Sequence, residues 1–382
     1  MVVVMDPLAS EEQKRQVEER LAAEYKPHGI DYRRIDGENQ TVYALIGPED
    51  RVDFESLSAI DGVFDARPVQ ENVNYSLVSR AAHEDDIPLR IGKEGNKSVV
   101  LGGERPLYIC GPCAVESREQ MYAVADSVAE WAVHDDYGQY VLRGGAWKPR
   151  TTPHSWQGLG EEAVEILSDV SEEFGIPVMT EARKESHCEI IANKLDGIWV
   201  GARNMYGQDL LEHAGSLGVP VIVKRHPGAS EEEFLNFSQY VISGQNGNSD
   251  HKGVLGLCLR GTVPFGSGKS FQRYPADIGS IPGLKRETYA PVVFDVSHSS
   301  GDSDFVDAFG RSALGMGADG LMVEVHPDPA GARTDQKQQI TPSAFIEFTK
   351  DWNTIHAISG NKHDEAGRIQ RRYRNVDMVR SF

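Results

Sequence analysis

The stretch GIWVGARNMYGQDLLEHAGSLGVPVIVKR, residues 197–225, contains the unit that repeats along most of this chain. It begins with an apolar run, continues through a loop into an amphipathic segment at 208–216, and returns to a second apolar run, PVIV, at 220. Short apolar runs rich in β-branched residues predict buried strands, and the amphipathic segment predicts a helix. A strand, a helix and another strand in this order are typical of a parallel sheet with helical crossovers.

The same unit recurs on both sides of this stretch. The apolar runs are LYIC at 107, YVL at 140, PVMT at 177, GIWV at 197, PVIV at 220, VLGLCL at 254, PVVFDV at 291 and GLMVEV at 320. Amphipathic segments follow most of them, at 117–133, 159–174, 208–216, 231–243 and 303–315. Eight buried strands that alternate with helices predict an α/β fold, a closed (β/α)8 TIM barrel over residues 91–352. A doubly wound open sheet is the alternative, and the count of eight strands favours the barrel.

Residues 1–70 predict a separate small α+β domain. Its expected elements are a strand at 1–5, a helix from Ser10 that stops at Pro27, strands at 31–35 and 41–46 around the turn DGEN, a helix from Glu49 to Ala59 and a strand at Val63–Val69. Ser10 and Gln13 have the spacing of a capping box. Val17, Leu21 and Tyr25 share one face of the first helix, and Phe54 and Leu57 are expected to point inward on the second. The order β-α-β-β-α-β is that of a ferredoxin-like domain.

The remaining segments connect or follow these domains. The polar residues 71–90 predict a linker, and residues 90–102 predict a small hairpin around Gly95. Residues 353–382 are expected to form a C-terminal tail, in which a solvated helix or a subunit contact is the favoured interpretation. Its basic residues are Arg368, Arg371, Arg372, Arg374 and Arg380.

Composition narrows the class of protein. Of 382 residues 40% are hydrophobic, which is enough for a large core, and the formal net charge of −19 argues against a nucleic-acid partner. No apolar run is long enough to span a bilayer, and Asp6 interrupts the apolar start too early for a signal peptide. Four cysteines do not make a disulfide framework, and Cys110 and Cys113 lack the second CxxC of a zinc knuckle. Cys188 and Cys258 are expected to be packing residues. We expect a cytoplasmic protein.

In TIM barrels the active site lies at the C-terminal ends of the strands. At every predicted strand end this chain has a charged or metal-ligating side chain, and chance would not place one at all eight. These residues are Cys113, Arg143, Thr180, Glu181, Arg203, Lys224, Arg225, Arg260, Asp295, His298, Glu324 and His326.

Two groups emerge from the strand ends and the loops beside them. A cationic group suits phosphate and carboxylate ligands: Arg143, Lys148, Arg150, Arg203, Lys224 and Arg260. A mixed sulfur, nitrogen and oxygen group suits a divalent transition metal: Cys113, His298, Glu324 and Asp335. A single arginine or buried cysteine at such a position is as readily structural, so the joint occurrence carries the interpretation.

Several motifs extend this interpretation. They are GPCAVES at 111–117, RGGAWKPRTTPHSWQGLG at 143–160, GARNM at 201–205, DVSH at 295–298 and GADGLMVEVHPDP at 317–329, followed by Asp335 and Gln338. In this order they strongly resemble 3-deoxy-D-arabino-heptulosonate 7-phosphate (DAHP) synthases, in particular the type I-beta enzymes with an N-terminal ferredoxin-like domain. The resemblance extends from about residue 1 to 350.

The resemblance implies a transferase that condenses phosphoenolpyruvate with erythrose 4-phosphate and water, the first step of the shikimate pathway to aromatic amino acids. It implies one divalent metal ion, with Mn as the first choice and Fe, Co or Zn as alternatives. Its implied ligands are Cys113, His298, Glu324 and Asp335. Cys113 and His298 would thereby also count as catalytic.

The resemblance also assigns the substrate contacts. Arg143, Lys148 and Lys224 would hold the carboxylate region of phosphoenolpyruvate, and Arg203 and Arg260 its phosphate. Lys148, Arg150 and Thr151 of the KPRT motif would receive the aldose phosphate. Lys148 and Glu181 are the candidates for proton transfer or water positioning.

Three departures from the family pattern leave the aldose open. Leu259 precedes Arg260 where a glutamate is usual, the loop at 262–277 differs although Arg273 and Asp277 keep their spacing, and His226 replaces a usual glycine. One alternative is therefore a related synthase that uses another aldose phosphate, although KPRT differs from the KANRS of the arabinose 5-phosphate enzyme. A sialic-acid synthase would need a further C-terminal domain. A non-catalytic regulatory homologue is disfavoured because each expected metal ligand is present.

The N-terminal domain contains none of the expected catalytic groups, so it needs another role. In the resembled subgroup that role is feedback inhibition, which implies tyrosine or phenylalanine as an effector. A module for solubility or oligomerisation is the alternative. A homo-oligomer, a tetramer or a dimer, is expected.

Overall fold

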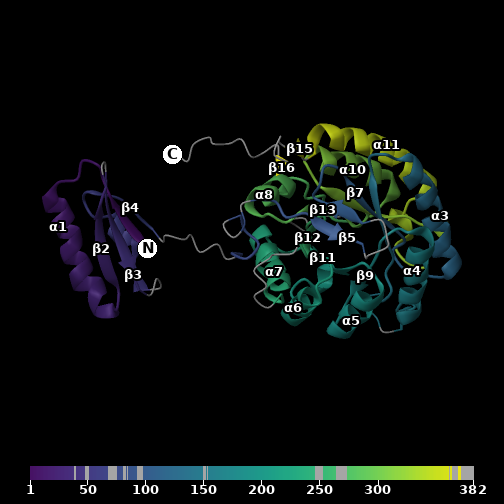
Figure 1. Ribbon diagram of the computed structural model, residues 1–382, viewed down its shortest axis with the longest axis horizontal. Coiled ribbons are helices and arrows are strands. Elements are labelled where there is room, and N and C mark those ends of the chain that lie inside the picture. The colour runs from purple at the N-terminus through teal and green to yellow at the C-terminus, as the bar shows by residue number, and fades with distance from the viewer. Residues whose placement is uncertain are drawn as a thin grey trace. The chain divides into compact units, whose positions relative to one another are not determined.

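The computed structural model describes residues 1–37, 40–47, 51–67, 75–80, 83, 85–92, 98–148, 152, 154–245, 253–263, 273–360, 362–363 and 369–370. The chain divides into two compact units, Met1–Asn74 and Tyr75–Phe382. Each unit has its own hydrophobic core, and the two are described separately below (Figure 1).

The N-terminal unit is an antiparallel four-stranded sheet in the order β2-β3-β1-β4. Its elements are β1 (Val2–Met5), α1 (Glu11–Arg20), β2 (Asp31–Asp36), β3 (Thr41–Ile46), α2 (Phe54–Ser58) and β4 (Val63–Arg67). Val3 and Met5 of β1 alternate with less buried neighbours and face a core that the helices complete. The predicted ferredoxin-like order of elements is confirmed.

The first helix begins as predicted but ends differently. The Ser10 hydroxyl accepts a hydrogen bond from the Gln13 backbone, and the Gln13 side chain accepts one from the Ser10 backbone N–H at 2.8 Å, so the capping box is present. The buried face of Val17, Leu21 and Tyr25 is also confirmed. Pro27 does not stop the helical path, which continues through a π-helical turn at Leu21–Tyr25 and a 3-10 turn at Lys26–His28. A proline near the start of a turn loses no hydrogen bond there, and the path ends at Gly29, whose φ is 82°.

The second helix is shorter than predicted. It begins at Phe54, because the Asp53 carboxylate accepts a hydrogen bond from the Ser56 N–H and so caps the helix there. Leu57 is fully buried and Phe54 partly buried, as expected. Glu49, Val69 and the second half of the DGEN turn lie outside the described residues.

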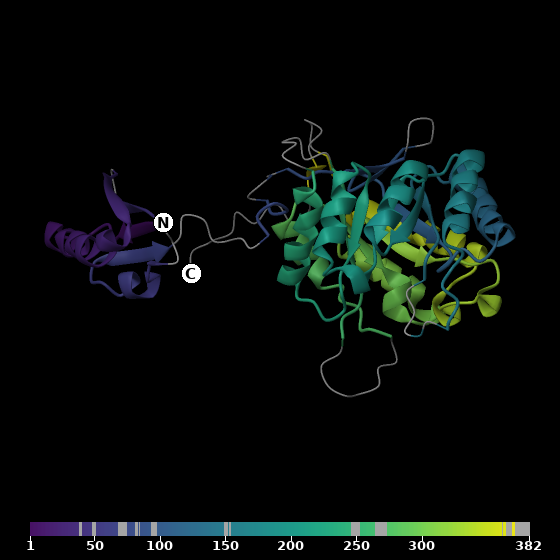
Figure 2. The same ribbon diagram turned by 90° about the horizontal axis from the view of Figure 1, so that it is seen from below.

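The second unit contains a closed barrel of eight parallel strands. They are β7 (Leu107–Gly111), β8 (Gln139–Arg143), β9 (Val178–Ala182), β10 (Gly197–Val200), β11 (Val221–Lys224), β12 (Leu255–Leu259), β13 (Val292–Asp295) and β14 (Gly320–Glu324). β14 pairs with β7 over five residues, which closes the sheet and excludes the open doubly wound alternative. Figures 1 and 2 show the strands inside a ring of helices.

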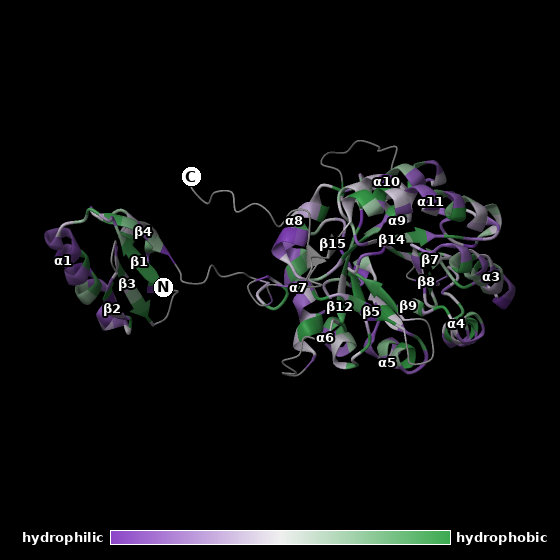
Figure 3. Cartoon of the chain, turned by 45° about the horizontal axis from the view of Figure 1, so that its top comes forward, coloured by the Kyte–Doolittle hydropathy of each residue, from purple (hydrophilic) through white to green (hydrophobic). Residues whose placement is uncertain are grey.

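The helices that cover the barrel are amphipathic. They are α3 (Arg118–His134), α4 (Glu161–Phe174), α5 (Glu185–Lys194), α6 (Gln208–Ser216), α7 (Glu231–Ser243), α8 (Ser280–Glu287), α10 (Val306–Gly315) and α11 (Pro342–Ser359), with the short α9 (Val296–Ser300) directly after β13. Figure 3 shows apolar strands inside and polar outer faces on the helices. The last of them, α11, extends to Ser359, beyond the predicted barrel end at 352, because Trp352, His356 and Ser359 are buried.

A hairpin closes the N-terminal end of the barrel. It consists of β5 (Leu89–Ile91) and β6 (Val99–Leu101), which pair antiparallel as predicted, while Gly95 lies outside the described residues. Leu89 and Leu101 are fully buried in one cluster with the barrel interior. This end of the barrel is therefore filled with apolar side chains, and the opposite end remains for a site.

Two segments differ from their predicted form. Residues 75–80 fall in the predicted linker, yet Val78 is buried and its carbonyl accepts a hydrogen bond from Thr288. In the C-terminal tail, Lys362–His363 and Ile369–Gln370 pair as two short strands, β15 and β16, where a helix was favoured. The other tail residues beyond Gly360 lie outside the described residues.

Candidate active site

The barrel interior consists of an apolar layer followed by a polar one. The apolar layer has one side chain from each strand: Ile109, Val141, Met179, Trp199, Ile222, Cys258, Val293 and Met322. Because side chains alternate along a strand, the residue two positions later points inward again, nearer the C-terminal end. Those residues are Gly111, Arg143, Glu181, Gly201, Lys224, Arg260, Asp295 and Glu324. The pleat of the strands thus places the charged residues in one layer.

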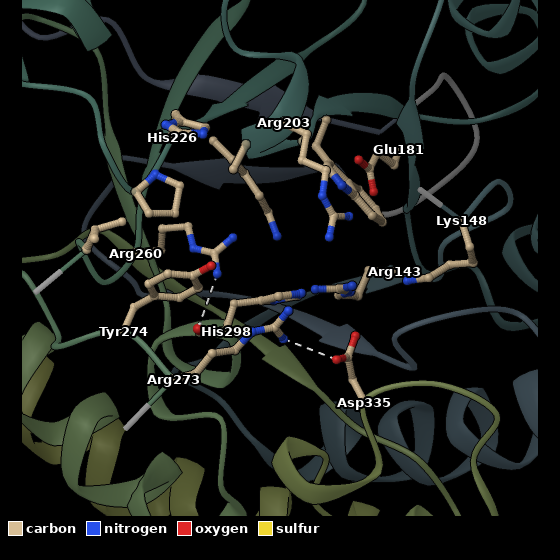
Figure 4. A pocket seen from close by; sticks show the side chains of 16 residues that line it. Arg143, Lys148, Glu181, Arg203, His226, Arg260, Arg273, Tyr274, His298 and Asp335 are labelled. Carbon is tan, nitrogen blue, oxygen red and sulfur yellow. Dashed lines mark hydrogen bonds and ion pairs between the residues drawn. The ribbon is translucent and has the colours of Figure 1, made fainter. Parts of the chain in front are cut away.

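A cavity of about 320 Å³ opens above this layer. Figure 4 shows its cationic side chains converging on one space. The lining residues are Arg143, Lys148, Glu181, Trp199, Gly201, Ala202, Arg203, Lys224, His226, Pro227, Arg260, Val263, Arg273, Tyr274, His298 and Asp335. Six of them are lysine or arginine, so the pocket suits an anionic ligand.

Trp199 forms part of the floor of this pocket. Arg143 and Lys224 lie over its ring, with Cζ of Arg143 4.9 Å and Nζ of Lys224 5.7 Å from the ring centroid. Each cation also has a carboxylate partner: Arg143 donates to Glu324 at 3.2 Å, and Lys224 to Asp295 at 2.6 Å. These pairs offset the cost of burying charge.

Arg143 has unused hydrogen-bond donors. Its side chain is only 2% exposed, and its Nε and Nη1 atoms have no hydrogen-bond partner among the described residues. Buried donors are nearly always paired, so this unmet capacity marks a position where a ligand's oxygen atoms would bind.

Next to the cations is a group of four mixed ligand-type side chains. Cys113, His298, Glu324 and Asp335 each offer one atom, and these atoms all lie within 4.8 Å of one another. Two ligands on opposite sides of one ion are separated by up to about 4.6 Å, so the four atoms are close to the spacing that a single ion requires. One sulfur, one nitrogen and two carboxylate oxygens are a donor set for a transition metal.

Neighbouring side chains orient this group. His298 Nδ1 lies 3.0 Å from the Asp295 carboxylate, which leaves Nε2 facing Glu324 at 3.6 Å. Gln338 donates from Nε2 to Glu324 at 2.6 Å and accepts at Oε1 from Arg273 at 3.0 Å. A metal-binding histidine typically donates its other ring N–H to a carboxylate, and a metal-binding carboxylate typically accepts a further hydrogen bond. Such contacts fix the orientation of the metal ligands.

Asp335 has an unusual backbone. Its φ of 50° is in the left-handed region, and it is the one non-glycine residue with positive φ in the described part of the chain. One carboxylate oxygen accepts from Arg273 at 3.1 Å, and the other lies 3.0 Å from Cys113 Sγ. Such a conformation costs roughly 1–3 kcal/mol and persists where surrounding contacts impose it, often at functional sites.

Burial and charge shift the pKa values in this group. Burial raises the pKa of the Cys113 thiol, and the Glu324 charge raises it further, so the thiol donates its proton toward Asp335. Burial alone would raise the pKa of Asp335, but His298, Cys113 and Arg273 together lower it to about 2. Burial lowers the pKa of His298, which favours the neutral imidazole. A neutral imidazole and an ionised carboxylate are the forms that bind metals.

Lys148 connects the two parts of the site. Its Nζ donates to the carbonyl oxygen of Cys113 at 3.0 Å and to Sγ of the same residue at 2.9 Å. Burial lowers the pKa of Lys148, but the charges of Cys113, Glu324 and Glu181 outweigh it, so the net pKa is raised. Glu181 lines the same pocket, and Gly201 leaves it room, because a Cβ there would lie 1.9 Å from its Oε1.

The structure brings most of the predicted site residues together. Cys113 and Glu324 lie beside the pocket, and Arg150 and Thr151 lie outside the described residues. The others line the cavity: Arg143, Lys148, Glu181, Arg203, Lys224, Arg260, His298 and Asp335.

Other strand-end residues serve the scaffold. Thr180 donates to Gly144 at 2.6 Å, and Arg225 binds Asp277 at 2.6 Å. His326 lies 3.9 Å from Glu116. Thr180 precedes Glu181 and Arg225 follows Lys224, which both point inward, so the pleat directs these two side chains away from the cavity.

Trp199, His226, Arg273 and Tyr274 line the pocket but were not predicted as site residues, although His226 and the spacing of Arg273 were noted in the sequence. Trp199 could have been found from the alternation in GIWV, which places it two residues before Gly201 on the inward side. Nothing local in the sequence indicates that Tyr274 turns into the pocket.

The fold and the site together define a TIM-barrel enzyme with a pocket for small anionic substrates. Residues 86–359 match the DAHP synthetase I family, and residues 1–71 match the DAHP synthase ferredoxin-like domain. The chain belongs to the DAHP synthetase I family. It is therefore an enzyme of the DAHP synthase type, whose reaction is the first step of the shikimate pathway.

Curated relatives agree with this assignment. The chain is 35% identical to the phospho-2-dehydro-3-deoxyheptonate aldolase of Thermotoga maritima over 365 residues, which cover 95% of this chain and 99% of that protein. It is also 32% identical to the 2-dehydro-3-deoxyphosphooctonate aldolase of Bartonella henselae, over 66% of this chain and 90% of that one.

Solved structures agree as well. The crystal structure of the Thermotoga maritima DAHP synthase superposes with a TM-score of 0.69 at 33% identity, covering 93% of this chain and 96% of that one. A truncated form of the Thermotoga maritima enzyme superposes with a TM-score of 0.62 and covers 74% of this chain. In the described part of the chain, no helix has the length and apolarity needed to cross a membrane.

Proposed function

We propose that this chain joins phosphoenolpyruvate to erythrose 4-phosphate in the barrel pocket, and that the pocket residues divide into a metal side and an anion side. The observation that carries this proposal is their adjacency. Six cations line one cavity, and His298 and Asp335, two members of the mixed-ligand group, line it too. Both substrates are phosphorylated, and a cationic pocket next to a metal can bind one and polarise the other.

On the metal side, Cys113, His298, Glu324 and Asp335 would hold one divalent ion, with Mn as the first choice and Fe, Co or Zn as alternatives. Their atoms fit one ion in spacing and in donor type. When bound, the ion supplies Lewis acidity toward the aldehyde oxygen of the aldose. Lys148, at 2.9 Å from the Cys113 sulfur, favours the ionised thiolate that a metal requires.

On the anion side, Arg143, Lys148 and Lys224 would bind the carboxylate region of phosphoenolpyruvate, with Arg203 and Arg260 on its phosphate. The unpaired donors of Arg143 support this division, because they lie at the buried end of the pocket. Holding the enol carbon of phosphoenolpyruvate against the aldehyde lowers the entropic cost of joining two substrates. Arg150 and Thr151, with Lys148, would receive the phosphate of the aldose.

The protons move at the border of the two sides. As the enol carbon bonds to the aldehyde, the new alkoxide oxygen takes up a proton. Water adds to C2 and loses one proton. As the C2 hydroxyl then becomes the carbonyl, its proton leaves with the departing phosphate. Lys148 and Glu181 both line the pocket and are the proposed proton donor and water-positioning base.

We also propose a regulatory role for the N-terminal unit. None of the proposed site residues lies in Met1–Asn74. A separately folded domain in the same chain as a barrel can act by binding an effector that favours one conformation of the protein. Tyrosine or phenylalanine is the proposed effector. A homo-oligomer, a tetramer or a dimer, is part of the same proposal.

A second candidate function is condensation with another aldose phosphate. This alternative is supported by the 32% identity between the chain and a 2-dehydro-3-deoxyphosphooctonate aldolase. The deciding experiment is a phosphate-release assay with phosphoenolpyruvate and a panel of aldose phosphates, with and without Mn. Turnover with erythrose 4-phosphate at least tenfold above the five-carbon sugar phosphates supports the proposal. The reverse preference would contradict it.

A further inference from the structure

Arg260 differs from its neighbours in how its charge is held. Arg143 and Lys224 have carboxylate partners, but no ion pair of Arg260 occurs in the described part of the chain. Its side chain is nearly buried, with the residue 8% exposed. Nη2 donates to the carbonyl oxygen of His298 at 3.3 Å, and Nε has no hydrogen-bond partner there. Arg260 therefore carries a buried charge that no carboxylate neutralises.

An aromatic ring takes the place of the missing carboxylate. Cζ of Arg260 lies 4.8 Å from the centroid of the Tyr274 ring, and both side chains line the pocket (Figure 4). An aromatic face attracts a cation through its quadrupole and uses none of the cation's N–H donors. These donors lie in the plane of the guanidinium and, apart from the Nη2 N–H that donates to His298, can bind a phosphate.

The backbone holds Tyr274 at this position. Its N–H donates to the carbonyl of Ser299 at 3.2 Å, and the N–H of Thr262 donates to the carbonyl of Pro275 at 3.0 Å. Gly261, next to Arg260, permits this close approach, because a Cβ at position 261 would lie only 2.3 Å from the backbone carbonyl oxygen of Tyr274. The ring is thus tied both to α9 and to the end of β12, the strand that carries Arg260.

We propose that Tyr274 is a positioning residue for the phosphate of phosphoenolpyruvate, acting through Arg260, an inference that rests on the proposed function. The ring fixes the plane of the guanidinium and leaves its charge uncompensated until the substrate arrives. A carboxylate in that place would compete with the phosphate for the same donors. In this chain Tyr274 therefore does the orienting that an acidic neighbour of Arg260 would otherwise do.

The test compares Tyr274→Leu, Tyr274→Phe and Tyr274→Gln with the unchanged enzyme. Steady-state rates are measured with phosphoenolpyruvate varied and erythrose 4-phosphate and Mn saturating, and calorimetry measures phosphoenolpyruvate binding directly. Loss of the ring is expected to weaken phosphoenolpyruvate binding about tenfold, with a smaller change in kcat. Tyr274→Phe keeps the aromatic face and is expected to retain most of the affinity for phosphoenolpyruvate. If the hydroxyl were the important group, Tyr274→Phe would lose that affinity.

The matched control is Tyr122→Leu. Arg118 lies 5.6 Å over the Tyr122 ring on the barrel's outer surface, so this variant removes a similar pair outside the site. Its phosphoenolpyruvate affinity is expected to equal that of the unchanged enzyme. If Tyr274→Leu does not fold, as judged by circular dichroism, Tyr274→Gln gives the same comparison with a polar side chain.

The outcomes separate this inference from the function on which it rests. Equal phosphoenolpyruvate affinity in the Phe variant and in the folded Leu or Gln variant overturns the role of Tyr274. If Arg260→Ala nevertheless loses affinity in the same assay, the assignment of Arg260 to the phosphate stands. If Arg260→Ala also binds normally, the assignment itself fails. Equal losses in the Phe and Leu variants would assign the effect to the hydroxyl and also overturn the inference.

Discussion

Single residues in the pocket differ in whether their charge is already compensated. Arg260 is the clearest example, because burial lowers its pKa and no carboxylate pairs with it in the described part of the chain. Arg260→Ala is expected to lower kcat/KM for phosphoenolpyruvate about tenfold or more, since a charge-assisted contact is worth about 1.5–3 kcal/mol. Arg286→Ala is the control, because that side chain is 75% exposed and forms an ion pair with its neighbour Glu287, outside the pocket. Kinetics within about twofold of the unchanged enzyme would mean that other residues bind the phosphate.

Gln338 is expected to act on the metal through the residues it orients. It joins Glu324 to Arg273, so Gln338→Leu removes one hydrogen bond from each of them. Glu324 keeps its contact with Arg143, and Arg273 keeps its contact with Asp335. Loss of such a contact typically weakens metal binding 10–100-fold, and we expect a change of about that size in Mn affinity measured by equilibrium dialysis. Gln336→Leu, in the same 3-10 turn, should bind Mn normally, since the Gln336 side chain donates to the Ala332 carbonyl and contacts no proposed metal ligand among the described residues. Equal Mn affinity in the two variants would contradict the orienting role.

Removal of the metal tests the mixed-ligand group as a whole. Chelation is expected to abolish activity, and Mn, Fe or Co should restore it, because Cys113, His298, Glu324 and Asp335 converge on one position. Added Mn should also raise the unfolding temperature, because a ligand that binds the folded state stabilises it. Full turnover by a preparation shown to be free of metal would exclude the metal site.

At the scale of secondary-structure elements, the β5–β6 hairpin is predicted to stabilise the barrel. Leu101 is fully buried, and its side chain packs closely against Gly256 of β12 and Gly320 of β14. A Cβ on these glycines would lie 3.4 Å and 3.2 Å, respectively, from the Leu101 side chain. Leu101→Ala leaves a cavity there, so the free energy of unfolding is expected to fall by about 2–5 kcal/mol in denaturant titrations. Val133→Ala, at a position 70% exposed, should change it by less than about 0.5 kcal/mol. Equal stabilities would mean that the hairpin contributes nothing to closing the barrel.

At the scale of the whole molecule, the two units are predicted to separate catalysis from regulation. A chain that lacks residues 1–74 keeps every described side chain of the pocket, because the boundary between the units falls after Asn74. We expect this variant to remain active and to lose its response to tyrosine and phenylalanine, since an effector acts only by binding one arrangement better than another. Initial rates of both forms, with each amino acid up to millimolar concentration, check this. A full-length enzyme that ignores both amino acids would leave the N-terminal unit with a structural role.

The sequence by itself determined the architecture of this protein and the chemical character of its site. Strands, helices and the capping box follow from local patterns, so the eight apolar runs indicated a barrel correctly. Because the C-terminal ends of parallel barrel strands lie on one side, the sequence also predicted that Arg143, Lys224 and Glu324 would share that end. The helices α5 and α8 were not predicted from these patterns, and neither was the path of the chain past Pro27.

Only the tertiary structure decided which of these residues meet. Arg143 and Glu324 are 181 positions apart and form an ion pair because β14 pairs with β7 and closes the barrel. The left-handed backbone of Asp335 and the ring of Tyr274 over Arg260 likewise depend on contacts between distant segments. A local pattern fixes the direction of a side chain within its own strand or helix. Its partners depend on the closure of the whole barrel, which no short stretch of sequence contains.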